Sequence, residues 1–215
     1  MLSRFEFTQT QFDWICSDLS QLPIARASAA SAALPLVLSP ITFKNYAGTC
    51  GFEYLKPLVD SAVKRGGTAG QRAKEYLSYL DVKKRGSIHL LDGGLSDNMA
   101  LRSVLEAGSV TGGVEQLLRL MRVTKVKKFV VLAVGAETSP DVMDFGGDQI
   151  PTLMTAMGSL VDVPINRYSS DTISLMRLAV RLVREELSRR PRPADSPFRE
   201  DAEIYFINGS LREIA

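Results

Sequence analysis

The chain is poor in the residues that build metal sites and disulfide frameworks. Its 215 residues include only two cysteines, Cys16 and Cys50, and a single histidine, His89. The two cysteines lie far apart and form no Cys-x-x-Cys pair. We therefore expect neither a disulfide framework nor a zinc site. With one histidine in the sequence, we also expect no metal centre and no cofactor.

Long apolar runs and a strong charge of one sign are absent too. No apolar run reaches the ~18 residues that a membrane-spanning helix needs. Residues 1–5 lack the continuous apolar core of a signal peptide. The net charge is +2, and no patch interleaves basic and aromatic residues, so nucleic acid is not the expected partner.

The composition is that of an ordinary globular protein, with strand and helix patterns in alternation. Hydrophobic residues make up 45% and charged residues 23% of the chain. Short apolar runs predict strands at residues 40–46, 88–91, 129–134 and 203–208. Apolar spacing predicts helices at residues 24–34, 52–64, 69–80, 99–106, 114–123, 151–161 and 172–188, whereas residues 5–8 and 12–16 fit a strand or a packed loop. This alternation favours one α/β domain with a mostly parallel sheet covered on both sides.

The strand at residues 88–91 leads into the candidate site. Asp92 follows it directly, and ligands and catalytic groups collect beyond the carboxyl ends of strands in open α/β sheets. Gly93 and Gly94 permit backbone angles that other residues avoid and let another group approach closely. Residues 96–98 are good N-caps for a helix. Asp92 is thus placed for chemistry, and an ordinary turn aspartate is the alternative.

This stretch resembles the Asp-Gly-Gly block of the bacterial patatin-like lipid acyl hydrolases, the patatin-like phospholipases. The block reads Asp92-Gly93-Gly94-Leu95-Ser96-Asp97-Asn98. Residues 23–30, followed by Leu34-Pro35, resemble the helix that precedes the block and lies beside the active site in that family. Residues 129–137, 163–168 and 205–207 are softer matches in the same order. The resemblance covers most of the chain and implies a three-layer α/β/α fold and a lipid or ester substrate.

In that family the aspartate of the block is the base of a Ser–Asp dyad, and this role maps onto Asp92. The resemblance implies that Gly93 and Gly94 form the turn that aims its carboxylate. The family's nucleophile lies in a Gly-x-Ser-x-Gly elbow upstream of the block. No serine of this sequence has glycine two residues before and two residues after it. The nearest match to the motif is centred on Ser96, where Asn98 stands in place of the second glycine.

We therefore expect residues 1–215 to be the C-terminal portion of a single patatin-like domain, incomplete at its N-terminal side. The complete protein would be a serine acyl hydrolase, and this chain alone would be inactive because it lacks the nucleophile. The expected partner is the missing N-terminal half. Without it, we expect open strand edges and uncovered apolar faces.

Two other functions stay open. The first is a non-catalytic remnant or interaction module that keeps the fold without the nucleophile. The second is a nucleotide-binding α/β domain, which would need a Gly-x-Gly-x-x-Gly that the sequence lacks. His89 is predicted to be a packed strand histidine rather than a catalytic one. Strand alternation directs it away from the side to which Asp92 points.

A basic stripe is expected on the last long helix. Arg177, Arg181 and Arg184 lie at i, i+4 and i+7 and so share one side. A solvated outer face is the ordinary explanation of such charges. Contact with an anionic membrane surface is the alternative. The resemblance implies a bacterial protein of the cell envelope or a secreted one, while the sequence itself leaves the location open.

Overall fold

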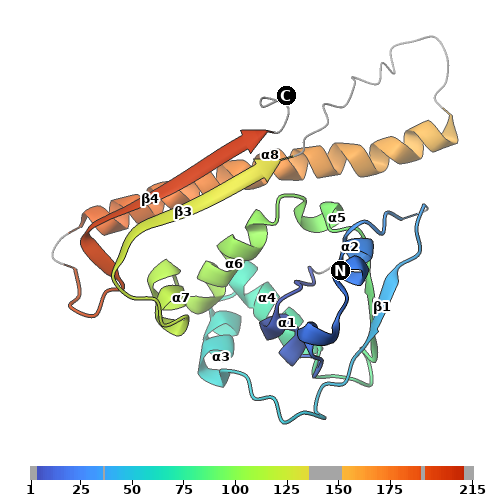
Figure 1. Ribbon diagram of the computed structural model, residues 1–215, viewed down its shortest axis with the longest axis horizontal. Helices are drawn as coiled ribbons and strands as arrows, with labels where there is room; N and C mark the ends of the chain where they lie inside the picture. The colour runs from blue at the N-terminus through green and yellow to red at the C-terminus, as the bar shows by residue number, and fades with distance from the viewer. Residues whose placement is uncertain (1–3, 36, 136–151, 190–191, 211–215) are drawn as a thin grey trace. The chain divides into compact units, whose positions relative to one another are not determined.

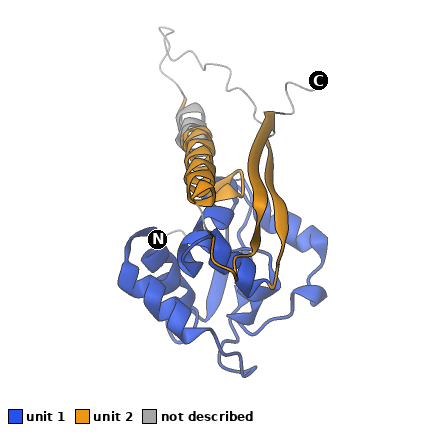
Figure 2. Ribbon diagram, turned by 90° about the vertical axis from the view of Figure 1, so that its left-hand side faces the viewer, with its two compact units in different colours: residues 1–96, 103–121 blue, residues 97–102, 122–215 orange. Residues whose placement is uncertain are grey.

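The computed structural model describes residues 4–35, 37–135, 152–189 and 192–210. Contacts divide the chain into two compact units, which Figure 2 colours separately. Unit 1 comprises residues 1–96 and 103–121, and unit 2 comprises residues 97–102 and 122–215. The class is mixed α/β, as predicted. Within the described ranges, no helix is both long and apolar enough to cross a membrane.

Unit 1 consists of short helices and one pair of strands (Figure 1). Local signals set several helix ends: Thr8 caps the first helix by accepting the N–H of Gln11, and Pro57 lies in the first turn of another. The elements from its N-terminus onward, with residues 97–102 counted in unit 2, are α1 (Gln9–Asp13), the 3-10 helix η1 (Leu19–Gln21), α2 (Ile24–Ser31), β1 (Ile41–Lys44), α3 (Lys56–Arg65), α4 (Gly67–Ser78), β2 (Ser87–Leu90), α5 (Gly94–Asp97), α6 (Leu101–Thr111) and α7 (Val114–Leu120).

Two predictions in unit 1 are only partly correct. Residues 12–16 were predicted to form a strand or packed loop, but α1 runs into this stretch. The helix predicted at residues 99–106 begins at Leu101 as α6 and runs on to Thr111, and the separate short helix α5 precedes it. Ala100, between them, has a φ of 53°, which is a left-handed conformation that interrupts a right-handed helix.

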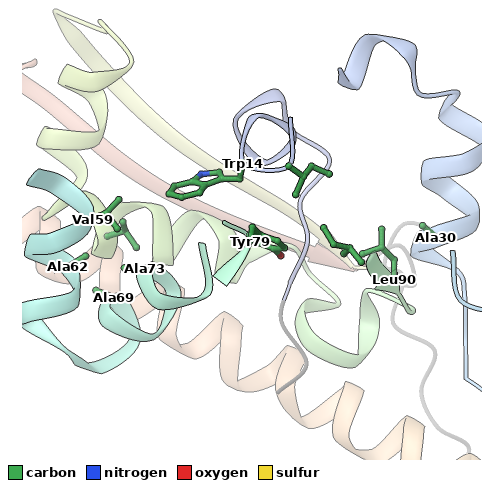
Figure 3. Close-up of a cluster of buried hydrophobic side chains, with 11 residues drawn as sticks. Trp14, Ala30, Val59, Ala62, Ala69, Ala73, Tyr79 and Leu90 are labelled. Carbon is green, nitrogen blue, oxygen red and sulfur yellow. The ribbon is translucent and has the colours of Figure 1, made fainter. Parts of the chain in front are cut away.

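The core of unit 1 is built from aromatic and small side chains (Figure 3). Trp14 stacks on Tyr76, with ring centroids 5.3 Å apart, and Tyr79 is fully buried. Small residues on α3 and α4, among them Ala62, Ala69 and Ala73, let the two helices pack closely. The outcome is an apolar centre around which the N-terminal segment, α3, α4 and β2 are assembled.

Cys16 and Cys50 form a disulfide, contrary to the expectation from cysteine spacing. Their Cα atoms lie 5.5 Å apart, although 34 positions separate them in the sequence. The bond joins the end of the α1 segment to the loop before α3. Sequence spacing could not reveal the pair, because it is created by folding of the intervening chain.

A buried arginine ties the N-terminal segment to α4. The Arg72 side chain is 3% exposed, and its guanidinium lies 2.8 Å from carboxylate oxygens of both Glu6 and Glu75. It also donates to the backbone carbonyl of Arg4 at 2.9 Å. Burial alone would lower the pKa of Arg72, but Tyr76, Glu75 and Glu6 outweigh it, so that pKa is raised. The cation is therefore held charged inside the unit.

The two strands of unit 1 are antiparallel, whereas a mostly parallel sheet was predicted. β1 pairs with β2 in a register that joins Thr42 to His89 and Phe43 to Ile88. The side chains of Ile88 and Leu90 are buried and those of Ser87 and His89 are exposed, so β2 is covered on one face only. The short apolar run at this position did not reveal the polar face or the direction of pairing.

Unit 2 combines a parallel strand pair with one long helix. β3 (Val126–Gly135) pairs with β4 (Phe198–Ser210), and α8 (Leu153–Ser188) packs on β4. Ala133 and Ile204 are buried on one face of the pair, while Val130, Leu132 and Val134 are exposed on the other. β3 was predicted to be buried on both faces. Its described residues instead have one uncovered apolar face.

The helix α8 replaces two separately predicted helices, with Pro164 inside it. The hydroxyls of Ser169 and Thr172 donate to the carbonyls of Ile165 and Tyr168, one turn earlier, so these polar side chains are satisfied within the helix. Residues 136–137, the end of the 129–137 match, lie outside the described residues.

Candidate active site

Asp92 lies just beyond β2, and the hydrogen bonds around it define the candidate site. One carboxylate oxygen, Oδ1, accepts the backbone N–H of Gly94 at 2.7 Å. This is the geometry of an aspartate that holds its own turn. The side chain is half-buried, so the carboxylate is fixed at one oxygen and still accessible to a further group.

The block is anchored on the end of α2. The backbone N–H of Asp92 donates to the carbonyl of Ala33 at 3.0 Å, and the N–H of Gly93 donates to the carbonyl of Ser31 at 3.2 Å. The last carbonyls of a helix have no partner inside the helix and need one elsewhere. Ala30 and Ala33 are buried here, and their small side chains permit this close approach. The alanine-rich segment and the Asp-Gly-Gly block are thus direct neighbours.

Gly93 and Gly94 do not have the backbone conformation that their residue type suggested. The described glycines with positive φ lie elsewhere, for example at Gly66 and Gly113, and Gly94 already belongs to α5. A Cβ added to Gly93 would lie 3.7 Å from the Ser31 hydroxyl oxygen, which is an ordinary contact. Here the turn is held by the Asp92 carboxylate rather than by a glycine-only backbone.

The predicted catalytic chemistry needs a hydroxyl next to Asp92. Within the described ranges, no serine hydroxyl donates a hydrogen bond to its carboxylate. The Ser31 hydroxyl lies beside Gly93 instead, as the contact distance shows. The site therefore offers a positioned carboxylate that no serine hydroxyl of the described residues contacts by a hydrogen bond.

His89 is not part of this arrangement, and the prediction that it is packed in the strand is wrong. Its side chain is exposed, and its Nδ1 lies 2.8 Å from the Thr42 hydroxyl oxygen on the neighbouring strand. Alternation along β2 turns it away from buried Ile88 and Leu90. In the described part of the chain, no group of three or more His, Cys, Asp or Glu side chains could hold a metal ion.

Unit 2 contains an open groove of about 440 Å³ that sequence reasoning missed. It lies between the end of α8 and the start of β4, and charged side chains line it. Arg184 donates to the carbonyl of Ile204 at 2.9 Å, and Arg192 donates to that of Leu187 at 2.7 Å. Both cations are thus engaged by backbone carbonyls, and the contacts join α8 to β4.

Comparisons with known proteins add no relative. A scan against protein-family models finds no match, and searches of curated proteins and of solved structures find no similar protein. The functional interpretation therefore rests on the Asp92 block and its geometry.

Proposed function

We propose that this chain supplies the base of a lipid acyl hydrolase, with Asp92 in the base role of a Ser–Asp dyad. The observation that carries the proposal is the Asp-Gly-Gly block directly beyond β2, with its backbone bonded to the end of α2. The carboxylate is oriented by the Gly94 N–H, and its half-buried position leaves it accessible.

The reaction is a two-step acyl transfer. The hydroxyl of a serine in a Gly-x-Ser-x-Gly segment outside these 215 residues attacks the ester carbonyl, and Asp92 accepts the hydroxyl proton. The proton passes to the leaving alcohol as the carbon–oxygen bond breaks. Asp92 then takes a proton from the water that attacks the acyl-serine, and it returns this proton to the serine oxygen as that oxygen leaves the acyl carbon and the acid is released.

The finer fold that we propose is a three-layer α/β/α arrangement with a mostly parallel sheet. The parallel pair β3–β4, with α8 on one face, supports it. The exposed face that carries Val130, Leu132 and Val134 would take the third layer, contributed by the N-terminal half of the domain. Covering these side chains would remove apolar surface from water.

A non-catalytic interaction module is the second candidate, and one observation favours it. The hydrogen bond from the Gly94 N–H to Asp92 is sufficient to explain the aspartate as a turn residue. As an interaction module, the chain would have the same fold but would not hydrolyse esters.

The two functions are distinguished by an ester assay on two proteins. We would measure p-nitrophenyl butyrate hydrolysis by this chain alone and by the chain joined to its natural upstream sequence. Activity only in the longer protein, with kcat at least 100-fold lower for Asp92→Asn, is the expected result. Asp81→Asn, which changes a half-exposed aspartate that pairs with Lys84, is the matched control and should leave kcat unchanged.

Inactivity of both proteins would favour the interaction module. Wild-type turnover by Asp92→Asn in an active longer protein would refute the base role of Asp92.

A further inference from the structure

Two buried hydroxyls of α8 accept hydrogen bonds from the segment that follows the Asp-Gly-Gly block. Ser169 and Thr172 are 4% and 2% exposed. Each hydroxyl donates its own hydrogen one turn back along α8, so its oxygen can still accept. Asn98 Nδ2 donates to the Ser169 oxygen at 3.3 Å. Arg102 Nε donates to the Thr172 oxygen at 2.9 Å, so two hydrogen bonds hold residues 97–102 on α8.

Arg102 makes the stronger of these two contacts. Its hydrogen bond to Thr172 is shorter than the bond from Asn98, and its donor is charged. The guanidinium also lies over the ring of Tyr168, 5.5 Å from the centroid. Arg102 therefore fixes the C-terminal end of the segment by two contacts with the same helix.

The backbone of this segment needs such external contacts. Ala100 has a φ of 53°, in the left-handed region that residues with a Cβ disfavour. α5 ends at Asp97 and α6 begins at Leu101, so no continuous helix holds the link between them. Asn98 and Arg102 contact α8 on either side of Ala100, and surrounding contacts of this kind maintain a disfavoured conformation.

One helical turn connects this segment to the Asp92 carboxylate. The N–H of Leu95 donates to the carbonyl of Asp92 at 3.3 Å, and that of Ser96 donates to the carbonyl of Gly93 at 3.0 Å. Gly94, the first residue of α5, donates its N–H to the Asp92 carboxylate. A displacement at the end of α5 therefore moves the group that orients this carboxylate.

We propose that Arg102 is a positioning residue for Asp92, with the buried Thr172 hydroxyl as its anchor. The carbonyls at the end of α2 hold the Asp-Gly-Gly block before its turn, and Arg102 holds the chain after it. Arg102 acts through residues 97–102 and α5. Its effect on the reaction rests on the proposed function of Asp92, whereas its effect on the turn does not.

The first test is amide hydrogen exchange, measured by NMR on the 215-residue chain. Thr172→Val removes the acceptor oxygen and keeps the shape of the side chain. Exchange of the Gly94 amide should become about tenfold faster, because the bond that holds the segment is lost. The amide of Tyr46, which donates to the carbonyl of Ile15 in unit 1, should exchange at the wild-type rate.

Ser174→Ala is the matched control on α8. The Ser174 hydroxyl also donates one turn back, to the carbonyl of Ser170, but its side chain is exposed. Its removal should leave exchange of the Gly94 amide unchanged. An effect as large as that of Thr172→Val would assign the change to a general loosening of α8 and would overturn the proposal.

Variants of Arg102 test the other partner of the bond. Arg102→Gln should accelerate Gly94 exchange as Thr172→Val does. The double variant should exchange no faster than either single variant, because both substitutions remove the same bond. Arg102→Lys keeps a cationic donor and should restore exchange to within about threefold of the wild-type rate.

The second test is p-nitrophenyl butyrate hydrolysis by the chain joined to its natural upstream sequence. Thr172→Val should lower kcat about tenfold and leave KM within about twofold, because a misaligned base slows the reaction without removing a binding contact. A kcat equal to that of the wild type, in an enzyme that Asp92→Asn inactivates, would overturn the positioning role.

The two tests separate this proposal from the proposed function. Unchanged Gly94 exchange in Thr172→Val and Arg102→Gln would overturn the positioning role, even if Asp92→Asn abolished turnover. Equal acceleration at Gly94 and Tyr46 would also overturn it, because the effect would then be global. Faster exchange at Gly94 alone, with wild-type turnover by Asp92→Asn, would support the hold on the turn and refute only the base role of Asp92.

Discussion

Replacement of the buried Arg72 should strongly destabilise unit 1. Its guanidinium bonds to Glu6, Glu75 and the carbonyl of Arg4 within 3 Å. It also lies over the ring of Tyr76, 4.5 Å from the centroid. Replacing it with methionine keeps much of the side-chain volume but leaves two carboxylates and a carbonyl without their shared donor.

The size of this destabilisation depends on how deeply the remaining partners of Arg72, Glu6 and Glu75, are buried. Breaking a buried ion pair by removing one partner costs about 3–5 kcal/mol. The Glu75 and Glu6 side chains are 17% and 26% exposed, so water can partly solvate them once Arg72 is replaced. We therefore expect Arg72→Met to lower the free energy of unfolding by about 3 kcal/mol. Arg72→Lys keeps the positive charge but loses the planar set of guanidinium donors, and it should lower the free energy of unfolding by about half as much.

Urea denaturation followed by tryptophan fluorescence is the suitable assay. Trp14 is the only tryptophan, and it is buried in the core of unit 1, so its emission reports on that unit. With a slope of roughly 2 kcal/mol per molar urea, Arg72→Met should lower the midpoint by about 1.5 M. Lys84→Met is the control, because Lys84 is 87% exposed in its pair with Asp81 and should shift the midpoint by less than about 0.3 M. Equal midpoints for the two variants would refute the ion-cluster account.

Five further variants test other interactions in unit 1. Replacing both cysteines of the disulfide by serine should cost about 4 kcal/mol in unfolding free energy, since the bond closes a loop across 34 positions, and chemical denaturation would measure it. Gly113→Ala should cost at least about 1 kcal/mol because its φ is 133°, whereas Gly93→Ala should cost less than about 0.5 kcal/mol; equal melting temperatures would contradict this. Gln11→Met should raise the unfolding free energy by about 1 kcal/mol, because both polar atoms of the buried Gln11 side chain lack a partner within the described chain. Burial raises the pKa of Tyr76 in the folded state. Its contribution to stability is therefore present below about pH 10 and is lost as the pH rises through the folded-state pKa. The urea midpoint should fall between pH 9 and pH 11, and it should fall less for Tyr76→Phe than for the wild type.

Local signals in the sequence predicted most of the elements. Pro57 and Gly66 mark the start of α3 and the boundary between α3 and α4, and both helices lie close to their predicted bounds. The apolar run before Gly135 predicted β3, which pairs in parallel as expected. The position of Asp92 just after a strand could also be predicted from the sequence, because it depends only on neighbouring residues.

Features that depend on distant contacts were not predictable. Strand direction in the β1–β2 pair and the Cys16–Cys50 bond arise when separate segments meet. Arg72 reads as a surface residue in an amphipathic helix, and its burial follows from carboxylates 66 positions earlier and three later. The turn at Asp92 was assigned to glycine conformations, whereas the carboxylate itself holds it.

The central claim, that Asp92 is the base that activates a serine, is tested most directly with a fluorophosphonate probe. The probe would be applied to the chain joined to its upstream sequence, as wild type, Asp92→Asn and Asp81→Asn, with Trp14 fluorescence as the check on folding. We predict that one serine is labelled, at least 100-fold more slowly in Asp92→Asn and at an unchanged rate in Asp81→Asn. Labelling of Asp92→Asn at the wild-type rate would contradict the claim.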